Sequence, residues 1–219
     1  MPDALKLQSL PLFPLGTVLF PGGLLPLQIF EVRYLDMIAK AYKAGAPFGV
    51  VLLSQGTEVR KPDTAPTPNA GTFAAEVFQQ VGTLASITHF ENPQAGLILI
   101  QCVGTQRFEV TRSERLRHGL WIADVKCREA DYTVDIPADL QGAANALQQL
   151  IENIKQRNPQ ASALPVQEPY RFKDCGWVAN RWCELLPIPP DLRQKLMSLD
   201  NPLVRLELVS DILQTTGIA

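Results

Sequence analysis

Short apolar runs broken by prolines make up the first part of the chain, from Leu10 to Met37. The strand-forming residues of this stretch alternate with Pro11, Pro14, Pro21 and Pro26. Because proline donates no backbone hydrogen bond, each strand segment there should be short and should bend. From Phe30 onward apolar residues recur at spacings of three and four, which predicts a helix that Gly45 ends.

The next part of the pattern predicts a small β-barrel. Residues 48–53 form an apolar run with two β-branched valines, typical of a strand buried on both faces. Residues 75–127 read as a meander whose first turn, at 91–96, contains Asn, Pro and Gly. About six strands joined by tight turns indicate a closed barrel, because closure removes exposed strand edges.

Further expectations concern the details of this barrel. Residues 54–72 have few groups to bury and should form a long exposed loop. The strands of the meander are expected at residues 78–90, 97–100, 107–111 and 120–127. In the opening stretch, the expected core residues are Leu12, Val18, Leu19 and Leu27.

After Tyr132 the period of the pattern changes from two to 3.6, which predicts helices. The first has Leu140 to Ile154 on one face, and a linker should follow at residues 159–171. Asp174 is a predicted N-cap, Asp191 lies in a predicted first turn, and Asn201 should cap a helix that begins at Pro202.

These patterns together predict an α+β protein with two parts. Residues 1–132 should form the β-barrel domain with its one helix, and residues 133–219 a helical subdomain of four helices. At 219 residues, with 46% hydrophobic and 19% charged residues, the chain has the composition of an ordinary folded protein.

Net charge and cysteine spacing argue against a nucleic-acid-binding or a metal-binding protein. The net charge is −2, so the electrostatic signature of a nucleic-acid-binding protein is missing and nucleic acid is a disfavoured partner. The four cysteines have no two-residue spacing and should be small core residues rather than metal ligands. Apolar stretches are broken by proline well before the ~18 residues of a membrane span. We expect a soluble cytoplasmic protein without a membrane segment.

Motifs for catalysis are missing from the sequence. No glycine directly precedes a lysine, so no G-x-x-x-x-G-K-[ST] phosphate-binding loop occurs. There is no G-x-S-x-G nucleophile elbow, and His89 and His118 are the two histidines. We therefore expect no catalytic residue, no cofactor and no metal. A hydrolase whose site is assembled from distant residues is the alternative.

Three groups of side chains are candidates for binding or chemistry. His89 beside Glu91 could act as an acid–base pair, but a solvated hairpin end is favoured. A solvated turn is likewise favoured for the basic cluster of Arg112, Arg115, Arg117 and His118. Trp177 and Trp182 should point in different directions on a helix, and an exposed Trp177 would be a candidate contact for polypeptide.

Four segments resemble one family in the family's own order. The opening L-P-L-F-P-L-G-T-V-L-F-P-G-G-L-L-P-L-Q-I-F-E-V-R-Y resembles the start of the N-terminal domain of Lon-type ATP-dependent proteases. Residues 81–87 resemble its V-G-T-x-A-x-I strand, and residues 104–108 resemble its G-x-x-R-F strand. Residues 185–206 look like its closing helices.

The resemblance implies a PUA-like β pseudo-barrel followed by a C-terminal helical bundle, in a stand-alone module without the ATPase and serine-lysine peptidase domains. Its implied partners are unfolded polypeptide or a protease or unfoldase. Arg107 and Phe108 lie on the matched motif and join Trp177 as candidate polypeptide-binding residues, although pairing of Arg107 with a carboxylate such as Glu31 is favoured. A PUA-like RNA-binding protein is the alternative that the acidic composition disfavours.

Overall fold

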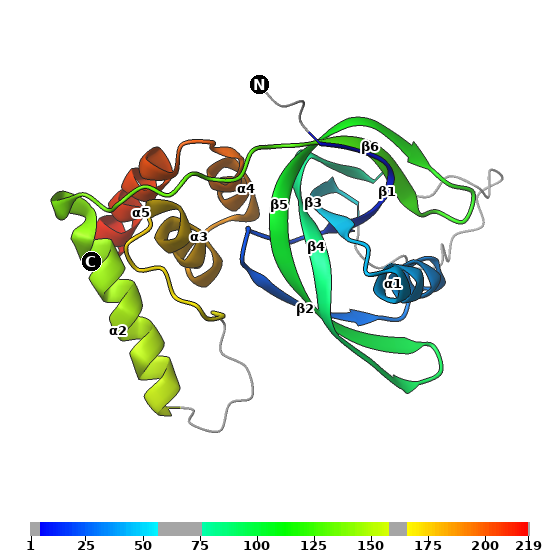
Figure 1. Cartoon of the computed structure of the whole chain (residues 1–219), viewed down its shortest axis with the longest axis horizontal. Helices are drawn as coiled ribbons and strands as arrows, with labels where there is room; N and C mark the ends of the chain where they lie inside the picture. Colours follow the sequence, from blue (N-terminus) through cyan, green and yellow to red (C-terminus); the bar gives the residue numbers. More distant parts are fainter. Residues whose placement is uncertain (1–4, 57–75, 158–165, 219) are drawn as a thin grey trace. The chain divides into compact units, whose positions relative to one another are not determined.

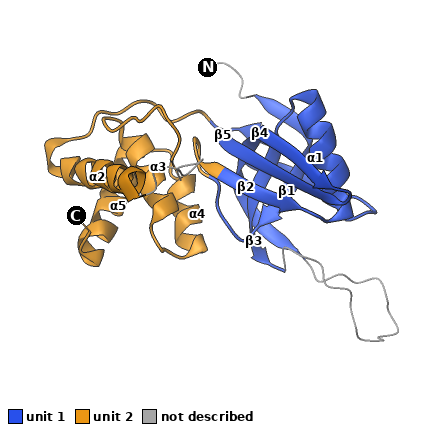
Figure 2. Cartoon of the chain, turned by 90° about the horizontal axis from the view of Figure 1, so that it is seen from below, with its two compact units in different colours: residues 1–19, 25–128 blue, residues 20–24, 129–219 orange. Residues whose placement is uncertain are grey.

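The computed structural model describes residues 5–56, 76–157 and 166–218. The chain forms two compact units, each made from two stretches of sequence (Figure 2). The first unit contains residues 1–19 and 25–128, and the second contains residues 20–24 and 129–219. The sequence pattern places the division after residue 132 and gives no sign that residues 20–24 fold with the helices.

In the described part of the chain, six strands form one sheet (Figure 1). They are β1 (Lys6–Leu15), β2 (Leu24–Ile29), β3 (Phe48–Gln55), β4 (Val77–Gln94), β5 (Leu97–Arg115) and β6 (Trp121–Cys127). Their order is β2-β5-β4-β3-β1-β6, and an additional pairing of β5 with β6 closes the ring. β2 lies outside this ring, next to β5.

The closure depends on β5, which is long enough to have three strand neighbours. Its first part runs antiparallel to β4, and its last part pairs with β6 from Phe108 opposite Cys127 to Arg115 opposite Trp121. Irregularities in both ladders mark the places where the strand bends. The strands expected at 97–100 and 107–111 are therefore two parts of one bent strand.

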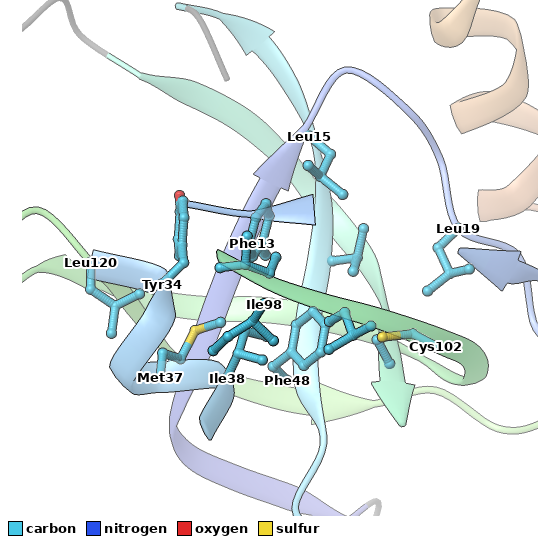
Figure 3. Packing of buried hydrophobic residues seen from close by; sticks show 14 residues of the cluster. Phe13, Leu15, Leu19, Tyr34, Met37, Ile38, Phe48, Ile98, Cys102 and Leu120 are labelled. Carbon is cyan, nitrogen blue, oxygen red and sulfur yellow. The ribbon is translucent and has the colours of Figure 1, made fainter. Parts of the chain in front are cut away.

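The first unit has two hydrophobic clusters, on opposite faces of its strands. One contains Phe13, Phe48 and residues of α1 (Figure 3), and the other contains Leu12, Phe108 and Val125. β3 is buried along its first five residues between β1 and β4, as the valine-rich run predicts. Leu12, Val18 and Leu19 are buried as expected. Leu27, which was also expected in the core, is half-buried and packs against the cluster that contains Ile29 of the same strand.

The helix α1 (Val32–Ala44) covers the barrel on one side, with Tyr34, Met37 and Ile38 directed into the core (Figure 3). Gly45 ends it, as predicted, in the left-handed conformation with φ 59°. Its backbone N–H donates to the carbonyl of Tyr42 at 3.1 Å.

The second unit is helical and follows the predicted pattern closely. A short 3-10 turn (Ala138–Leu140) leads into α2 (Gln141–Arg157), followed by α3 (Cys175–Leu185), α4 (Pro190–Ser198) and α5 (Pro202–Thr216). Asp174 accepts the N–H of Gly176 at 3.0 Å, and Asn201 accepts that of Leu203 at 3.0 Å. Both predicted N-caps are thereby confirmed, as is the α+β fold class.

Two buried arginines organise the polar interior of this unit. Arg205 donates to the carboxylate of Asp131, to the amide oxygen of Asn180 and to main-chain carbonyls at the end of α4. Arg181 donates to the carbonyls of Pro21 and Gly22 and to Glu184, the last at 2.8 Å. These bonds explain why residues 20–24 belong to the helical unit although both their neighbours along the chain belong to the barrel.

Most of the loop expected at 54–72 and part of the linker expected at 159–171 lie outside the described residues. In the described ranges, none of the helices combines the length and the apolar character needed to cross a membrane.

Candidate functional site

A groove of about 660 Å³ runs along α1 in the first unit. One wall is the helix itself, and the other is the turn that connects β5 to β6. We call it the α1 groove; its lining residues are Pro11, Val32, Arg33, Asp36, Met37, Lys40, Ala41, Ala44, Ala46, Pro47, Leu116, His118 and Leu120.

Helical periodicity and small side chains create this groove. Arg33, Met37, Ala41 and Ala44 recur at three- and four-residue spacing, so they lie on one face of α1. Alanine at the C-terminal end of that face leaves space that a larger side chain would fill. Leu116 and Leu120 add apolar surface on the opposite wall, and the walls are therefore mainly apolar.

The N-terminal end of the groove is fixed by a buried ionic network around Arg33. Its guanidinium binds Glu31 at 2.9 Å, Glu76 at 3.1 Å and the carbonyl of Gly119 at 3.1 Å. Burial by itself would lower the pKa of Arg33, but Tyr34, Glu31 and Glu76 outweigh it and raise the pKa. The arginine that lines the groove is thus permanently charged and already neutralised by protein carboxylates.

The rim of the groove carries charges that are also compensated. Lys40 binds Asp36 at 2.6 Å one helical turn away, and both side chains are exposed. His118 is exposed at the turn. Neither wall therefore presents a concentration of one charge, and the groove suits apolar groups better than phosphates.

A smaller pocket of about 220 Å³ lies where β1, β2 and the start of α1 meet. We call it the β2 pocket; it is lined by Phe13, Leu15, Pro26, Leu27, Gln28, Ile29, Phe30, Glu31 and Tyr34. The rings of Phe13 and Tyr34 stack with centroids 4.0 Å apart (Figure 3). Phe30 is 52% exposed. This pocket is therefore apolar inside and has an aromatic ring at its exposed edge.

The structure buries all three residues that the sequence proposes for polypeptide binding. Arg107 is 3% exposed and Phe108 is fully buried, both on β5. A Cβ atom at Gly82 would lie 2.6 Å from the Phe108 ring, and one at Gly49 would lie 2.8 Å from it. Phe108 thus fills space that two glycines leave open in the barrel. Glu31, the suggested partner of Arg107, binds Arg33.

Trp177 is 5% exposed and Trp182 is 2% exposed, so neither ring is the exposed contact for polypeptide that the sequence analysis considered. Trp177 packs edge-to-face on Phe172 at 5.3 Å, and Trp182 donates its indole N–H to the carbonyl of Ala143. The helix directs both rings inward because most of α3 is buried. A role of Arg107, Phe108 or Trp177 in polypeptide binding stays a prediction, and their burial favours packing.

The other candidate side chains lie in solvent or in the core. His89 and Glu91 form an exposed pair at 2.8 Å on β4. In the basic cluster, Arg115 stacks over Trp121 at 6.0 Å, whereas Arg112 is exposed. All four cysteines are free and buried, as expected. Among the described residues, no group of three or more His, Cys, Asp and Glu side chains could hold a metal ion.

Sequence reasoning missed the α1 groove because it followed large apolar residues of the helix such as Tyr34 and Ile38, which pack in the core. The groove is marked instead by Ala41, Ala44 and Ala46, which lie close together at the end of the helix. A run of small residues beside a helix end was the signal available.

Comparison with known proteins gives one family for nearly the whole chain. A sequence model of the family described as the ATP-dependent protease La (LON) substrate-binding domain matches residues 9–215. None of the curated proteins compared with the chain is significantly similar to it.

Two solved structures are similar over almost their full length. A Lon N-terminal domain protein from Xanthomonas campestris is 28% identical, with a TM-score of 0.68, over 94% of this chain and 98% of its own. The N-terminal domain of Mycobacterium avium complex Lon protease is 15% identical, with a TM-score of 0.53, over 93% of this chain and 97% of its own. At that identity the second likeness concerns the fold alone.

Proposed function

The chain belongs to the family of the ATP-dependent protease La (LON) substrate-binding domain, and from this premise we propose that it is a non-catalytic module that recognises polypeptide. The observation that carries the proposal is the α1 groove, an apolar hollow of about 660 Å³ on the surface of the barrel unit. We propose that apolar side chains of an unfolded or partly folded client bind there.

The shape and lining of the groove support this class of ligand. An unfolded chain offers apolar side chains that a folded protein keeps in its core, and an exposed apolar hollow provides a surface to bury them. Met37, whose side chain packs in the core, and Ala41 contribute to the apolar lining of the groove. The groove therefore selects for exposed apolar residues rather than for one sequence.

The charge distribution argues against the alternative of RNA. Binding to a phosphate backbone depends on lysines and arginines whose charges are available to phosphate. Arg33 is already held by Glu31 and Glu76, and Lys40 is paired with Asp36. The net charge of the chain is −2.

The test compares an unfolded chain with its folded counterpart. Reduced, carboxymethylated α-lactalbumin remains unfolded under native conditions, whereas native α-lactalbumin offers the same sequence in folded form. We expect fluorescence anisotropy to detect binding of the unfolded form and little binding of the native form. Equal binding of both forms, or of neither, would contradict the proposed function.

A pair of variants on α1 locates the binding surface. Ala44 and Ala39 are both exposed on the helix, but only Ala44 is among the groove residues. Ala44→Glu should weaken binding about tenfold or more because it places a charge in an apolar site, while Ala39→Glu should change it less than about twofold. Similar losses in both variants would assign the effect to charge on the helix rather than to the groove.

We further propose that the module presents its client to an ATP-dependent protease, in keeping with the family. Co-purification of the full chain from cells should then recover a protease or unfoldase together with the client. Recovery of RNA without protein would favour the RNA-binding alternative.

A further inference from the structure

The strand β2 has an open edge. It stands at the end of the strand order, and β5 is its neighbour among the strands of the described residues. In the described part of the chain, no backbone group of a turn or loop bonds to residues 25–29. Among the described residues, no further strand, turn or loop therefore pairs with the backbone N–H and C=O groups on one side of β2, which is the edge to which another extended chain could add.

Pro26 indicates which backbone groups face that edge. A proline within a strand is tolerated where the ladder does not need its missing N–H, which favours an orientation of Pro26 with its nitrogen away from β5. Backbone groups in a strand alternate in direction, and those of Gln28 therefore point to the same side as those of Pro26. The open edge thus offers the N–H and C=O of Gln28 and the C=O of Pro26.

An apolar pocket lies beside this edge. Leu27 and Ile29 of β2 meet Phe13 and Leu15 of β1 in the β2 pocket, and Phe30 stands exposed at its end. Its volume of about 220 Å³ is below the range of about 300–1,000 Å³ that small-molecule sites occupy. It has room for a side chain rather than for a cofactor.

We propose that β2 is a docking strand, to which an extended apolar polypeptide segment adds as a further strand while one of its side chains enters the β2 pocket. This inference rests on the proposed function and gives it a binding mode. Backbone hydrogen bonds to Gln28 would supply affinity for any extended sequence, and the pocket would require an apolar residue at one position.

This mode explains how one site can distinguish unfolded from folded clients. In a folded protein most strands are already paired and their apolar side chains are buried, so neither contact is available. An unfolded segment has both its backbone and its side chains free. The occupant is therefore a polypeptide in extended form.

The first test separates the backbone of Gln28 from its side chain. Gln28→Pro removes the N–H at the open edge, and Gln28→Ala removes only the exposed side chain. With carboxymethylated α-lactalbumin as the probe, Gln28→Pro should weaken binding about tenfold and Gln28→Ala less than about twofold. Equal effects in the two variants, whether large or absent, would overturn the proposal.

The second test uses the wild-type protein and so does not depend on the fold of a variant. The probe is a ten-residue peptide of alternating leucine and threonine with lysines at its ends, N-methylated at one backbone position at a time. Methylation should abolish binding at alternate positions and be tolerated between them, because only every second residue faces β2. A uniform response along the peptide, or no binding of the unmethylated peptide, would overturn the docking strand.

The outcomes distinguish this inference from the function on which it rests. Loss of all binding to unfolded α-lactalbumin in the wild type would refute both. Binding that depends on Ala44 but not on Gln28 would preserve the function and refute the docking strand. A wild type that dimerises, together with a monomeric Gln28→Pro variant, would assign the edge to a second copy of the chain and overturn the proposal.

Discussion

Arg33 donates to the carboxylate of Glu76 at 3.1 Å, and the same carboxylate accepts the indole N–H of Trp121 at 2.7 Å. Glu76 directly precedes β4, and Trp121 begins β6, so one buried carboxylate connects the start of α1 to two strands. The wall of the α1 groove is therefore held in place by electrostatics at one end and by apolar packing along the helix.

Removal of the Arg33 side chain should destabilise the barrel unit strongly. Arg33→Met leaves Glu76 buried without its cation, and breaking a buried pair in this way costs about 3–5 kcal/mol. Lys40→Met is the matched control, because Lys40 forms an exposed pair on the same helix and its loss should change stability by less than about 0.5 kcal/mol. Urea unfolding measures both. If Arg33→Met and Lys40→Met unfold at the same urea concentration, the buried ion pair contributes no more to stability than the exposed one.

The four thiols should be unreactive in the folded protein. Burial raises the pKa of Cys102 and Cys183 to about 12 and that of Cys175 to about 11, and it also raises the pKa of Cys127. The thiolate is the reactive species, so almost none is available at pH 8. Ellman's reagent should therefore detect no fast-reacting thiol until urea unfolds the chain. One thiol that reacts within seconds without denaturant would indicate local opening around it.

Stability should depend on pH through Glu184. Burial raises the pKa of Glu184 from its ordinary 4.5 to about 8, although Arg181 and Arg193 oppose the shift. Between these values the folded state retains a proton that the unfolded state has released, so stability falls as the pH rises. Glu184→Gln removes this titration. The unfolding free energy of the wild type minus that of the variant should therefore decrease from pH 5 to pH 8 and then level off.

Both proteins are measured by urea unfolding at several pH values. All other titratable groups contribute equally to the two unfolding free energies, so their contributions cancel in the difference. A difference that stays constant between pH 5 and pH 8 would mean that the contact with Arg181, at 2.8 Å, keeps Glu184 ionised in the folded state.

Trp177→Ala should act on stability rather than on binding. Truncation of a buried tryptophan costs about 3–5 kcal/mol, and Trp177 packs on Phe172 inside the second unit. Tyr132→Ala, at a side chain that is 61% exposed, should cost less than about 0.5 kcal/mol. Affinity for unfolded α-lactalbumin should be unchanged at temperatures where the variant remains folded. Weaker binding by a fully folded Trp177→Ala protein would restore the role that the sequence proposes.

The fold could be predicted from the sequence where local chemistry decides the structure. Asp174, Asn201 and Gly45 define helix ends because a side-chain acceptor or a left-handed residue satisfies the groups there. The apolar run at 48–53 identifies a central strand. The family resemblance, read from four short segments, is confirmed by the match over residues 9–215.

Features that depend on contacts between distant residues could not be predicted in this way. No periodicity shows that 97–115 is one bent strand, because the bend depends on which neighbours β5 meets. The inward direction of Trp177 depends on packing around the whole of α3. The α1 groove arises because large side chains are missing from the C-terminal end of one face of the helix. Small residues give a weaker signal in the sequence than a stripe of large apolar residues does.

The bonds from Arg181 to the carbonyls of Pro21 and Gly22 have a consequence for biosynthesis. Gly22 leaves the ribosome 159 residues before Arg181. The helical unit therefore completes its polar interior with a segment that is synthesised well before its helices. A gene fragment that begins at residue 129 would encode every helix of that unit and still lack the carbonyl acceptors of a guanidinium buried at its centre.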